Sequence, residues 1–434
     1  MNTRQGNSNS IRTILLILIT LGTPWKNYVH AGSALLYPTL VKQFYTLNNN
    51  QLFWMQDADG YKRKRLALLA YINNADKMGL TAKKYHQNEL SGYNTHIPSN
   101  AEETKKADYL ITDAAIALCK DIYQGSNMTQ WASYDAISST YRSVDNNYLL
   151  QELNNVRNDA DIMTLMNKLE PQTSDYMQLK NALADCRPNK DAIKIKQLVT
   201  SMNYYRWIWH FHLDSFIVVN IASATLRYYK KDNLMLNMRA VLGQPNKKTP
   251  RFAAYCSEVT LYPYWYMPRS IAVNEWLNSF KRNPRLLSMM NMVVINNNGK
   301  IISPYSINWS AVNKNNFAYQ IREATGCSNP LGVIKFTLTS PYAVYMHDTN
   351  LKDVFSYDSR YRSHGCIRLQ DPVGLANALL PKPVDTAFLQ ACFNNQQPVV
   401  QAIPKPVPTF VVYMTASVNE NGVVEYYKDI YRLL

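Results

Sequence analysis

The chain has 434 residues, a length that allows two or three domains, each with its own core. Its residues are 47% hydrophobic and 18% charged, which excludes global disorder. A formal net charge of +15 favours polyanionic partners such as an anionic membrane surface or an acidic cell-wall polymer. No run of lysines and arginines concentrates that charge, so we do not expect a nucleic-acid partner.

The first segment, residues 1–31, predicts an export signal. A basic start is followed by a short apolar core from Ile14 to Gly22 and by small residues that place a cleavage point after Ala31. The apolar core is too short to span a bilayer comfortably. A buried first helix or an uncleaved anchor is the alternative. We expect an exported protein of the periplasm or cell envelope.

Residues 32–205 predict an α-helical domain. Four runs in this region place apolar residues at helical spacing, and Gly79 and Gly125 follow two of them where a C-cap glycine would lie. The polar stretch from residue 185 to residue 197 is expected to be the last connector before the pattern changes. No internal repeat and no low-complexity segment is apparent.

Residues 206–434 predict a mainly β domain with peripheral helices, so the expected fold class is α+β and multidomain. Runs rich in β-branched and aromatic residues, divided by turn-forming residues, favour strands. Strands are expected within residues 216–230, 234–243, 333–340, 342–348 and 366–370. Hairpins are expected at residues 292–302 and 409–429, and helices at residues 270–284, 372–380 and 385–393.

A cysteine and two histidines lie close together in "YMHDTNLKDVFSYDSRYRSHGCIRLQDP", which begins at Tyr345. Cysteine attack on an acyl carbon needs a thiolate, a proton acceptor and donors for the developing oxyanion. Cys366 can supply the thiol and His347 the imidazole. Gly365 can adopt backbone angles that point successive amides at one spot. This chemistry requires the strands that carry His347 and Cys366 to be neighbours.

Other interpretations of these residues remain open. A lone cysteine is usually a small buried hydrophobe. His347, His364 and Cys366 could also hold a zinc ion with one open position, because His364 and Cys366 would share a face of a strand. The six cysteines are too few for a disulfide scaffold. If Cys366 stays free, an odd number remains and at least one more thiol is unpaired.

A second group, His210, His212 and Asp214, would share one face if its segment were a strand. Packing beside Trp207 and Trp209 is the favoured interpretation, and no function is assigned there.

The motif "SHGCIR", with His347 sixteen residues before its serine, resembles the signature of the L,D-transpeptidase family, cysteine enzymes that cross-link or edit bacterial peptidoglycan. Segments such as "VNIASATLRYY" and "LYPYWYMPRSIAVNEW" fall in the order of the large, scaffold-bearing branch of that family. The resemblance implies a helical scaffold domain (residues 32–205), then a catalytic domain (residues 206–434) with a lid at about residues 250–330.

The resemblance also implies roles for individual residues. Cys366 would be the acylated nucleophile and His347 its general base. Ser363, His364 and Gly365 would complete the motif, with local amides forming the oxyanion hole. Arg368 would order the loop or meet a substrate carboxylate, with a structural ion pair equally open. Trp265 and Tyr266 would line the donor site, although core packing explains such aromatic residues as well. No metal and no cofactor is expected.

The expected reaction is attack of Cys366 on the diaminopimelate–D-Ala amide of a tetrapeptide stem, release of D-Ala, and transfer of the acyl group to a diaminopimelate amine of a second stem. Carbapenem-type β-lactams are expected as covalent inhibitors. The alternatives are a carboxypeptidase, a D-amino-acid exchange enzyme and a non-catalytic wall-binding scaffold. Two departures from the branch are the short stretch around residues 187–197, where a peptidoglycan-binding module is common, and Asn350, where proline is common.

Overall fold

The structure is a computed structural model that describes residues 34–94, 96–126 and 132–434, without the side chains of residues 139–145. The export signal expected in residues 1–31 lies outside these residues. A helical region comes first and a mainly β region follows, which confirms the α+β multidomain prediction. Across the described ranges, every helix is too short or too polar to cross a membrane.

The helical region begins with α1 (Pro38–Leu47) and ends with α8 (Ala192–Trp209), and its longest helix is α4 (Ala101–Gln124). The other helices are α2 (Asp59–Asn73), η1 (Ala75–Met78), η2 (Ala82–Tyr85), α3 (Gln87–Leu90), η3 (Ser91–Asn94), α5 (Ser138–Asn154), α6 (Asp159–Leu169) and α7 (Ser174–Cys186). Gly79 and Gly125 follow η1 and α4 with positive φ angles, as their positions in the sequence predicted.

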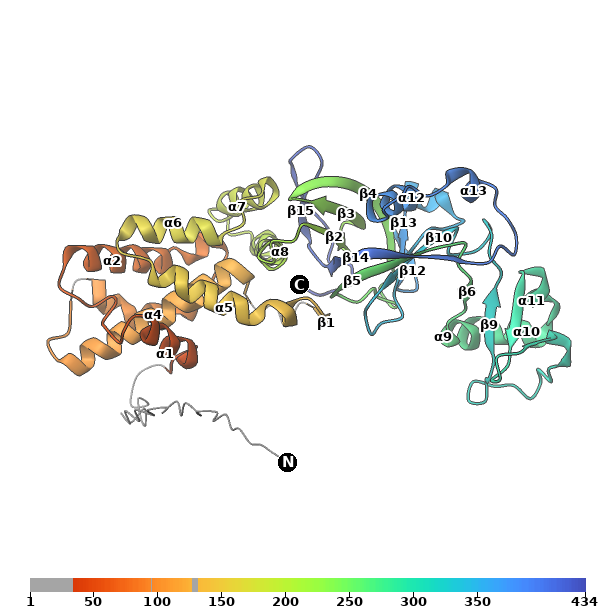
Figure 1. Ribbon diagram of the computed structural model, residues 1–434, viewed down its shortest axis with the longest axis horizontal. Helices are drawn as coiled ribbons and strands as arrows, with labels where there is room; N and C mark the ends of the chain where they lie inside the picture. The colour runs from red at the N-terminus through yellow and green to blue at the C-terminus, as the bar shows by residue number, and fades with distance from the viewer. Residues whose placement is uncertain (1–33, 95, 127–131) are drawn as a thin grey trace, which may run out of the picture. The chain divides into compact units, whose positions relative to one another are not determined.

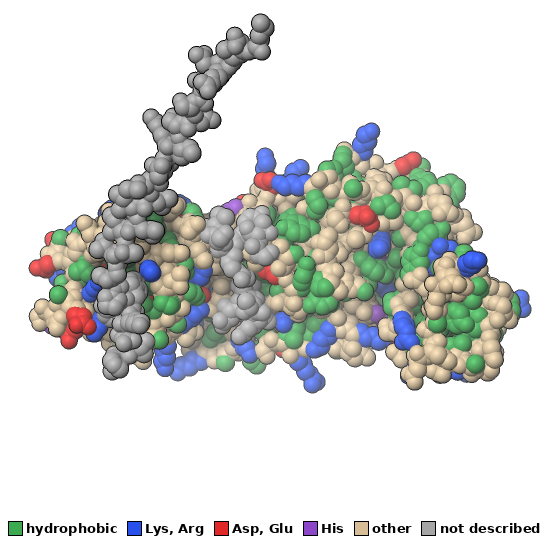
Figure 2. Space-filling view, turned by 60° about the horizontal axis from the view of Figure 1, so that its bottom comes forward, with side chains coloured by type: hydrophobic (Ala, Val, Ile, Leu, Met, Phe, Trp, Pro, Cys, Tyr) green, Lys and Arg blue, Asp and Glu red, His purple; other side chains and the backbone are tan. Residues whose placement is uncertain are grey.

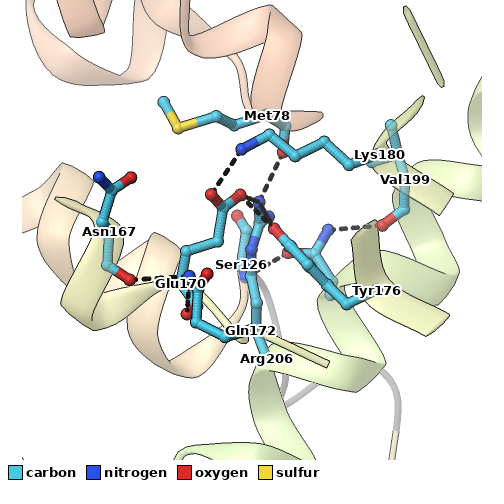
Figure 3. Close-up of polar contacts among 10 residues, drawn as sticks. Met78, Ser126, Asn167, Glu170, Gln172, Tyr176, Lys180, Val199 and Arg206 are labelled. Atoms are coloured by element: carbon cyan, nitrogen blue, oxygen red, sulfur yellow. Dashed lines mark hydrogen bonds and ion pairs between the residues drawn. The ribbon is translucent and has the colours of Figure 1, made fainter. Parts of the chain in front are cut away.

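A buried polar cluster holds the later helices of this region together (Figure 3). Glu170, in the turn after α6, accepts hydrogen bonds from the Tyr176 hydroxyl at 2.6 Å and from Lys180 at 2.5 Å, both on α7. Arg206 on α8 is fully buried and donates to the Tyr176 hydroxyl and to the Met78 carbonyl, each at 2.7 Å. The cluster therefore joins α6, α7, α8 and η1 through one set of charge-assisted hydrogen bonds.

One expectation about the end of this region was wrong. The predicted connector of residues 185–197 is limited to residues 187–191, because the Asp191 side chain caps the N-terminus of α8 at Lys194. The segment of His210 and His212 is not a strand: His210 is the C-cap of α8, and its Nδ1 donates to the Trp207 carbonyl at 2.7 Å. His210 packs edge-on against Tyr123, in line with the structural interpretation.

The β region is a sheet that closes on itself, because β14 (Val399–Val412) pairs with both β2 (Ser215–Asn220) and β5 (Phe252–Leu261). The path between them runs from β5 through β10 (Ile334–Leu338), β11 (Met346–His347), β13 (Ile367–Leu369), β4 (Asn233–Gly243) and β3 (Thr225–Lys230) to β2. Closure removes the unpaired edges that such long strands would otherwise expose. The short β1 (Tyr134–Asp135) joins β5, and β12 (Tyr361–Ser363) joins β4.

The closed sheet has an apolar layer on each face. One layer includes Ile217, Val219 and Phe336, and α12 (Pro372–Leu379) and α13 (Thr386–Gln390) contribute to it. On the other face, Phe216, Val218 and Phe410 pack against α7 and α8, with the Trp207 and Phe410 rings 5.2 Å apart. Alternate residues of β2 thus serve different cores, as strand geometry requires. The C-terminal hairpin, β15 (Ala416–Val418) and β16 (Val424–Tyr426), turns at the predicted residues.

A separate group of helices and strands follows β5 (Figure 1) and has its own apolar core. It lies in the segment predicted to be a lid and is called the lid below. Its sheet contains β6 (Trp265–Tyr266), β9 (Gln320–Glu323), β7 (Met292–Ile295) and β8 (Ile301–Ile302). Its helices are α9 (Arg269–Ile271), the π-helical turn η5 (Ala272–Trp276), α10 (Leu277–Arg282), α11 (Arg285–Met289) and η6 (Pro304–Ser306).

The predicted lid began too early, at about residue 250. Residues 252–261 form β5, a strand of the main sheet that pairs with both β10 and β14 and is largely buried. Such a strand lacks the alternation of buried and exposed residues that identifies half-buried strands. After the lid, a disulfide joins Cys327 to Cys392, just beyond α13.

Candidate active site

The two short strands β11 and β13 place the cysteine and histidine of the predicted site. They pair in parallel, with Met346 opposite Ile367 and His347 opposite Arg368. The neighbouring strands that the cysteine chemistry requires are therefore present. Cys366, immediately before β13, and His347 line one cleft of about 600 Å³ between the sheet and the lid.

The residues before Cys366 form a tight, internally bonded turn. Gly365 has a φ of +117°, a backbone conformation that favours glycine. The buried Ser363 hydroxyl donates to the Cys366 carbonyl at 2.6 Å and accepts from the Gly365 amide at 3.1 Å. The Gly365 amide is thus already engaged, and the turn keeps His364 and Cys366 from sharing a strand face. The open zinc alternative needed both residues on one strand, whereas β12 ends at Ser363 and β13 begins at Ile367.

His347 is held in the tautomer that a general base needs. Its Nδ1 contacts the Asp348 carbonyl at 2.5 Å, and because a carbonyl only accepts, Nδ1 carries the proton. The lone pair is then on Nε2. Burial, followed by the charge of Arg368, lowers the pKa of His347 to about 3, although the hydrogen bond to Asp348 opposes this shift. The imidazole is neutral at physiological pH.

The Cys366 thiol is half-buried and donates to the Ala343 carbonyl at 3.7 Å. Burial raises the pKa of Cys366, while hydrogen bonds from the Tyr345 amide and hydroxyl and the charge of Arg368 oppose the increase. Burial and the sulfur together raise the pKa of Tyr345, whose hydroxyl also interacts with Trp265. The resting pair is therefore a neutral thiol and a neutral imidazole. Tyr345 lies two residues before His347, and the sequence did not predict that it would contact the thiol.

A carboxylate of the lid reaches the motif. Glu275, in the π-helical turn η5, lies 2.6 Å from the Lys247 ammonium and 3.0 Å from His364 Nε2. The hydrogen bond from Lys247 is the main cause that lowers the pKa of Glu275, so the group is ionised at neutral pH. Glu275 is the single acidic residue among the described residues that line the cleft, where Lys247, Lys248 and Arg368 are basic. Nothing in the sequence marked Glu275, because the contact joins segments far apart in the chain.

The remaining predicted residues divide into two groups. Arg368 lines the cleft and forms no ion pair within the described parts of the chain, which disfavours the structural-ion-pair interpretation. Trp265 also lines the cleft, whereas Tyr266 does not and has 45% of its surface exposed. Neighbouring residues of a strand point to opposite faces, so the pairing of Trp265 with Tyr266 as lining residues was wrong. Within the described residues, no group of three histidine, cysteine, aspartate or glutamate side chains could hold a metal ion.

Comparisons with known proteins agree with this architecture. Residues 214–386 match the family model of the L,D-transpeptidase catalytic domain, and residues 39–183 match that of a scaffold domain. A Haemophilus influenzae protein named as a candidate L,D-transpeptidase is 29% identical over 329 residues, which are 75% of this chain and 65% of that relative. The chain thus spans just under two thirds of the relative's length.

Solved structures give weaker similarities. An L,D-transpeptidase from Mycobacterium smegmatis is 15% identical, with a TM-score of 0.20 over 46% of this chain and 58% of the other. The catalytic domain of the E. faecium L,D-transpeptidase acylated by ertapenem is 15% identical, with a TM-score of 0.18 over 43% of this chain and 95% of the other. By its family matches, the chain carries, in residues 214–386, a catalytic domain of the L,D-transpeptidase family, preceded by a scaffold domain.

Proposed function

We propose that the protein is a peptidoglycan L,D-transpeptidase that works through a Cys366 thioester. The observation that carries the proposal is the shared cleft of Cys366 and His347, in which Nε2 of a neutral imidazole is unprotonated. The donor substrate is a tetrapeptide stem that ends in diaminopimelate and D-Ala. The acceptor is the side-chain amine of a diaminopimelate residue in a second stem.

In the acylation step, the Cys366 sulfur forms a bond to the carbonyl carbon of the diaminopimelate–D-Ala amide as the thiol proton passes to Nε2 of His347. Because the thiol pKa is raised and the imidazole pKa is lowered, this proton transfer accompanies the attack instead of preceding it. The carbon–nitrogen bond then breaks, and His347 returns the proton to the departing D-Ala amine. In the second step the acceptor loses a proton to solvent and attacks as the free amine, displacing the sulfur. His347 takes a second proton from the attacking nitrogen and passes it to the leaving thiolate, which restores the neutral thiol.

Donors for the oxyanion are proposed from residues next to the thiol. The Gly365 amide is committed to Ser363, so the Cys366 amide and the Tyr345 hydroxyl are the better candidates. Arg368, a cation that faces the cleft without an acidic partner among the described residues, is proposed to hold the carboxylate of the donor stem. Glu275 is proposed to attract the acceptor, which arrives as an ammonium.

Export is part of the proposal, with the periplasm or cell envelope as the location, because peptidoglycan lies outside the cytoplasmic membrane. The basic start, apolar core and small residues of residues 1–31 support it. Carbapenem-type β-lactams are proposed as covalent inhibitors, because an acylating thiolate opens the strained lactam ring.

The proposal is tested by incubating the chain with defined tetrapeptide muropeptides and analysing the products by mass. A cross-linked dimer with one D-Ala lost supports transpeptidation, a trimmed monomer supports the carboxypeptidase alternative, and an exchanged terminal residue supports the exchange enzyme. The Cys366→Ala chain should give none of these products. A correctly folded parent chain that neither processes muropeptides nor forms a carbapenem adduct would instead be a non-catalytic scaffold.

A further inference from the structure

A second cleft lies on the catalytic domain, apart from Cys366. It encloses about 390 Å³ and is bounded by the turn between β2 and β3, the middle of β4, the residue before β12, and the β15–β16 hairpin. It shares no lining residue with the catalytic cleft. Gln370, in this second cleft, is four residues beyond Cys366, or about 13 Å along a strand.

Two arginines meet in this cleft without an acidic partner. Arg239 donates to the Phe355 carbonyl at 2.9 Å, and Arg360 donates to the carbonyls of Tyr357 and Ser223, each at 3.1 Å. Within the described residues neither guanidinium forms an ion pair. Burial, and then the charge of Arg239, lower the pKa of Arg360, with weaker opposing effects from Tyr361, Tyr427 and Asp358. Two like charges are thus held together where a single anion would relieve their repulsion.

Three buried polar atoms of lining residues have no hydrogen-bond partner in the described parts of the chain: Arg227 Nε, Arg360 Nε and Asn237 Oδ1. Native proteins satisfy most of their buried polar groups. Arg227 forms an ion pair with Asp175 at 3.0 Å, outside the cleft, but its Nε is not used there. The wall of this cleft therefore contains polar groups that the surrounding described residues leave unsatisfied.

The charge of the cleft restricts the ligand. The lining contains three arginines (Arg227, Arg239 and Arg360) and two glutamates (Glu420 and Glu425), so its formal charge is +1. That balance suits a monoanionic carboxylate better than a phosphate, which approaches two negative charges at neutral pH. The hydroxyl and amide side chains around it, such as those of Ser223, Gln370 and Asn421, suit the peptide groups that precede a C-terminal carboxylate.

We propose that this second cleft, the arginine cleft, binds the C-terminal carboxylate of a short peptide. Arg239 and Arg360 hold the carboxylate, and the surrounding amide and hydroxyl side chains bind the adjoining peptide groups. The binding site stands independently of the reaction at Cys366. Its use in the cell wall, where it would hold a second stem of the same polymer and raise the effective concentration at the catalytic cleft, rests on the proposed function.

The test is isothermal titration of N-acetyl-D-alanyl-D-alanine onto the full chain with Cys366→Ala, which prevents turnover. Replacing Arg239→Gln and Arg360→Gln together should weaken one binding event by at least about tenfold, so that the chain binds one peptide fewer. The C-terminal amide of the same peptide should also lose that event. The matched control, Arg282→Gln with Arg285→Gln, removes the same charge from exposed lid positions and should bind like its parent.

A variant that is expected to bind the peptide more tightly is also needed, because misfolding can explain a loss of binding but not a gain. Glu420→Gln raises the formal charge of the cleft from +1 to +2 and should tighten peptide binding about threefold. The proposal is overturned if the Arg239/Arg360 variant binds as many peptides as its parent. It is also overturned if the peptide amide binds like the acid, if Glu420→Gln leaves the affinity unchanged, or if inorganic phosphate binds this cleft more tightly than the peptide. These measurements use a catalytically inactive chain, so failure of the proposed reaction would not affect them.

Discussion

The thiol of Cys366 and the imidazole of His347 are a neutral pair in the resting site, because burial raises one pKa and lowers the other. Alkylation of Cys366 by iodoacetamide, followed at its own peptide by mass analysis, should therefore keep accelerating through about pH 9, above the ordinary pKa of a thiol. His347 is unprotonated down to its pKa of about 3, so acylation by a carbapenem should lose no activity to its protonation between about pH 5 and pH 7. An alkylation rate that is already level at neutral pH would indicate a preformed thiolate–imidazolium pair.

Glu275 should affect the second half of the reaction more than the first. Glu275→Gln removes the single acidic group of the described cleft lining, so transfer to an amine acceptor should fall about tenfold and hydrolysis of the thioester should gain correspondingly. The measurement is the ratio of cross-linked to trimmed muropeptides. The control is Lys247→Met, which removes the partner of Glu275 in their ion pair. This variant should give a higher ratio of cross-linked to trimmed muropeptides than Glu275→Gln. An unchanged ratio in Glu275→Gln contradicts the assigned role.

Residues whose chemistry depends on their own local motif could be predicted from the sequence. Residues that enter the cleft through contacts between distant segments could not. That Cys366 and His347 would share a cleft could be predicted, because a rare thiol lies near an imidazole within a short, specific motif. Glu275 and Tyr345 were not predicted to line it: Glu275 is 89 positions before its partner His364, and a tyrosine in a strand resembles a core residue. Tyr266 was wrongly placed in the cleft because the two faces of a two-residue strand cannot be distinguished from composition.

Among the helices, the buried polar cluster that joins α6, α7 and α8 should make stability strongly dependent on Arg206. Arg206→Met removes its hydrogen bonds to Met78 and Tyr176 and weakens the compensation of the buried Glu170 carboxylate, at a cost of about 3 kcal/mol in the free energy of unfolding. Lys180→Met, at a partly exposed position of the same cluster, should cost about 1 kcal/mol. Denaturant titration of both variants checks the difference. Equal losses in the free energy of unfolding would mean that the burial of a side chain does not determine its contribution to the cluster.

The disulfide between Cys327 and Cys392 links the end of the lid to the segment after α13. Replacing both with serine should lower the free energy of unfolding by about 2–4 kcal/mol, because the cross-link restricts the unfolded chain. Thermal unfolding with and without dithiothreitol checks this. Reductant should bring the parent to the midpoint of the double variant and leave the variant unchanged. If dithiothreitol does not change the unfolding midpoint of the parent chain, the predicted stabilisation by this disulfide is contradicted.

The types of most elements were predictable, and their boundaries were less so. The hairpin at residues 292–302 and the turn of the C-terminal hairpin were confirmed, because turn-forming residues divide short β-branched runs. The second hairpin is shorter than predicted, since residues 409–412 belong to β14 and pair with β2 and β5. The assignment of residues 252–261 to the lid failed because a strand that pairs on both sides and is buried on both faces carries no alternating pattern. The start of α8 was missed since its cap, Asp191, lay inside a stretch whose lysines looked like a linker.

Across the whole molecule, α7 and α8 share a core with the closed sheet, while the lid has its own. Tyr205 and Trp207 of α8 belong to the same apolar cluster as Phe216, Val218 and Phe410 of the sheet. The lid cluster is built from different residues, among them Phe280 and Trp309. On the face shown in Figure 2, Lys and Arg side chains project at many separate places, not in one patch. The two cores predict that α7, α8 and the closed sheet form one cooperative unit and the lid another.

Phe410→Ala should separate these units experimentally. Phe410 is fully buried between α8 and β2, so its removal should cost about 3–5 kcal/mol. Because α7, α8 and the sheet share this core, hydrogen exchange should accelerate in all three together, while the lid amides of β7 and β9 keep their protection until global unfolding. Phe280→Ala, which truncates a ring stacked on Trp276 in the lid, should do the reverse and accelerate exchange in the lid alone. Acceleration confined to the sheet in Phe410→Ala would show that the helices are a separate unit, and that the contact between Trp207 and Phe410 does not couple them.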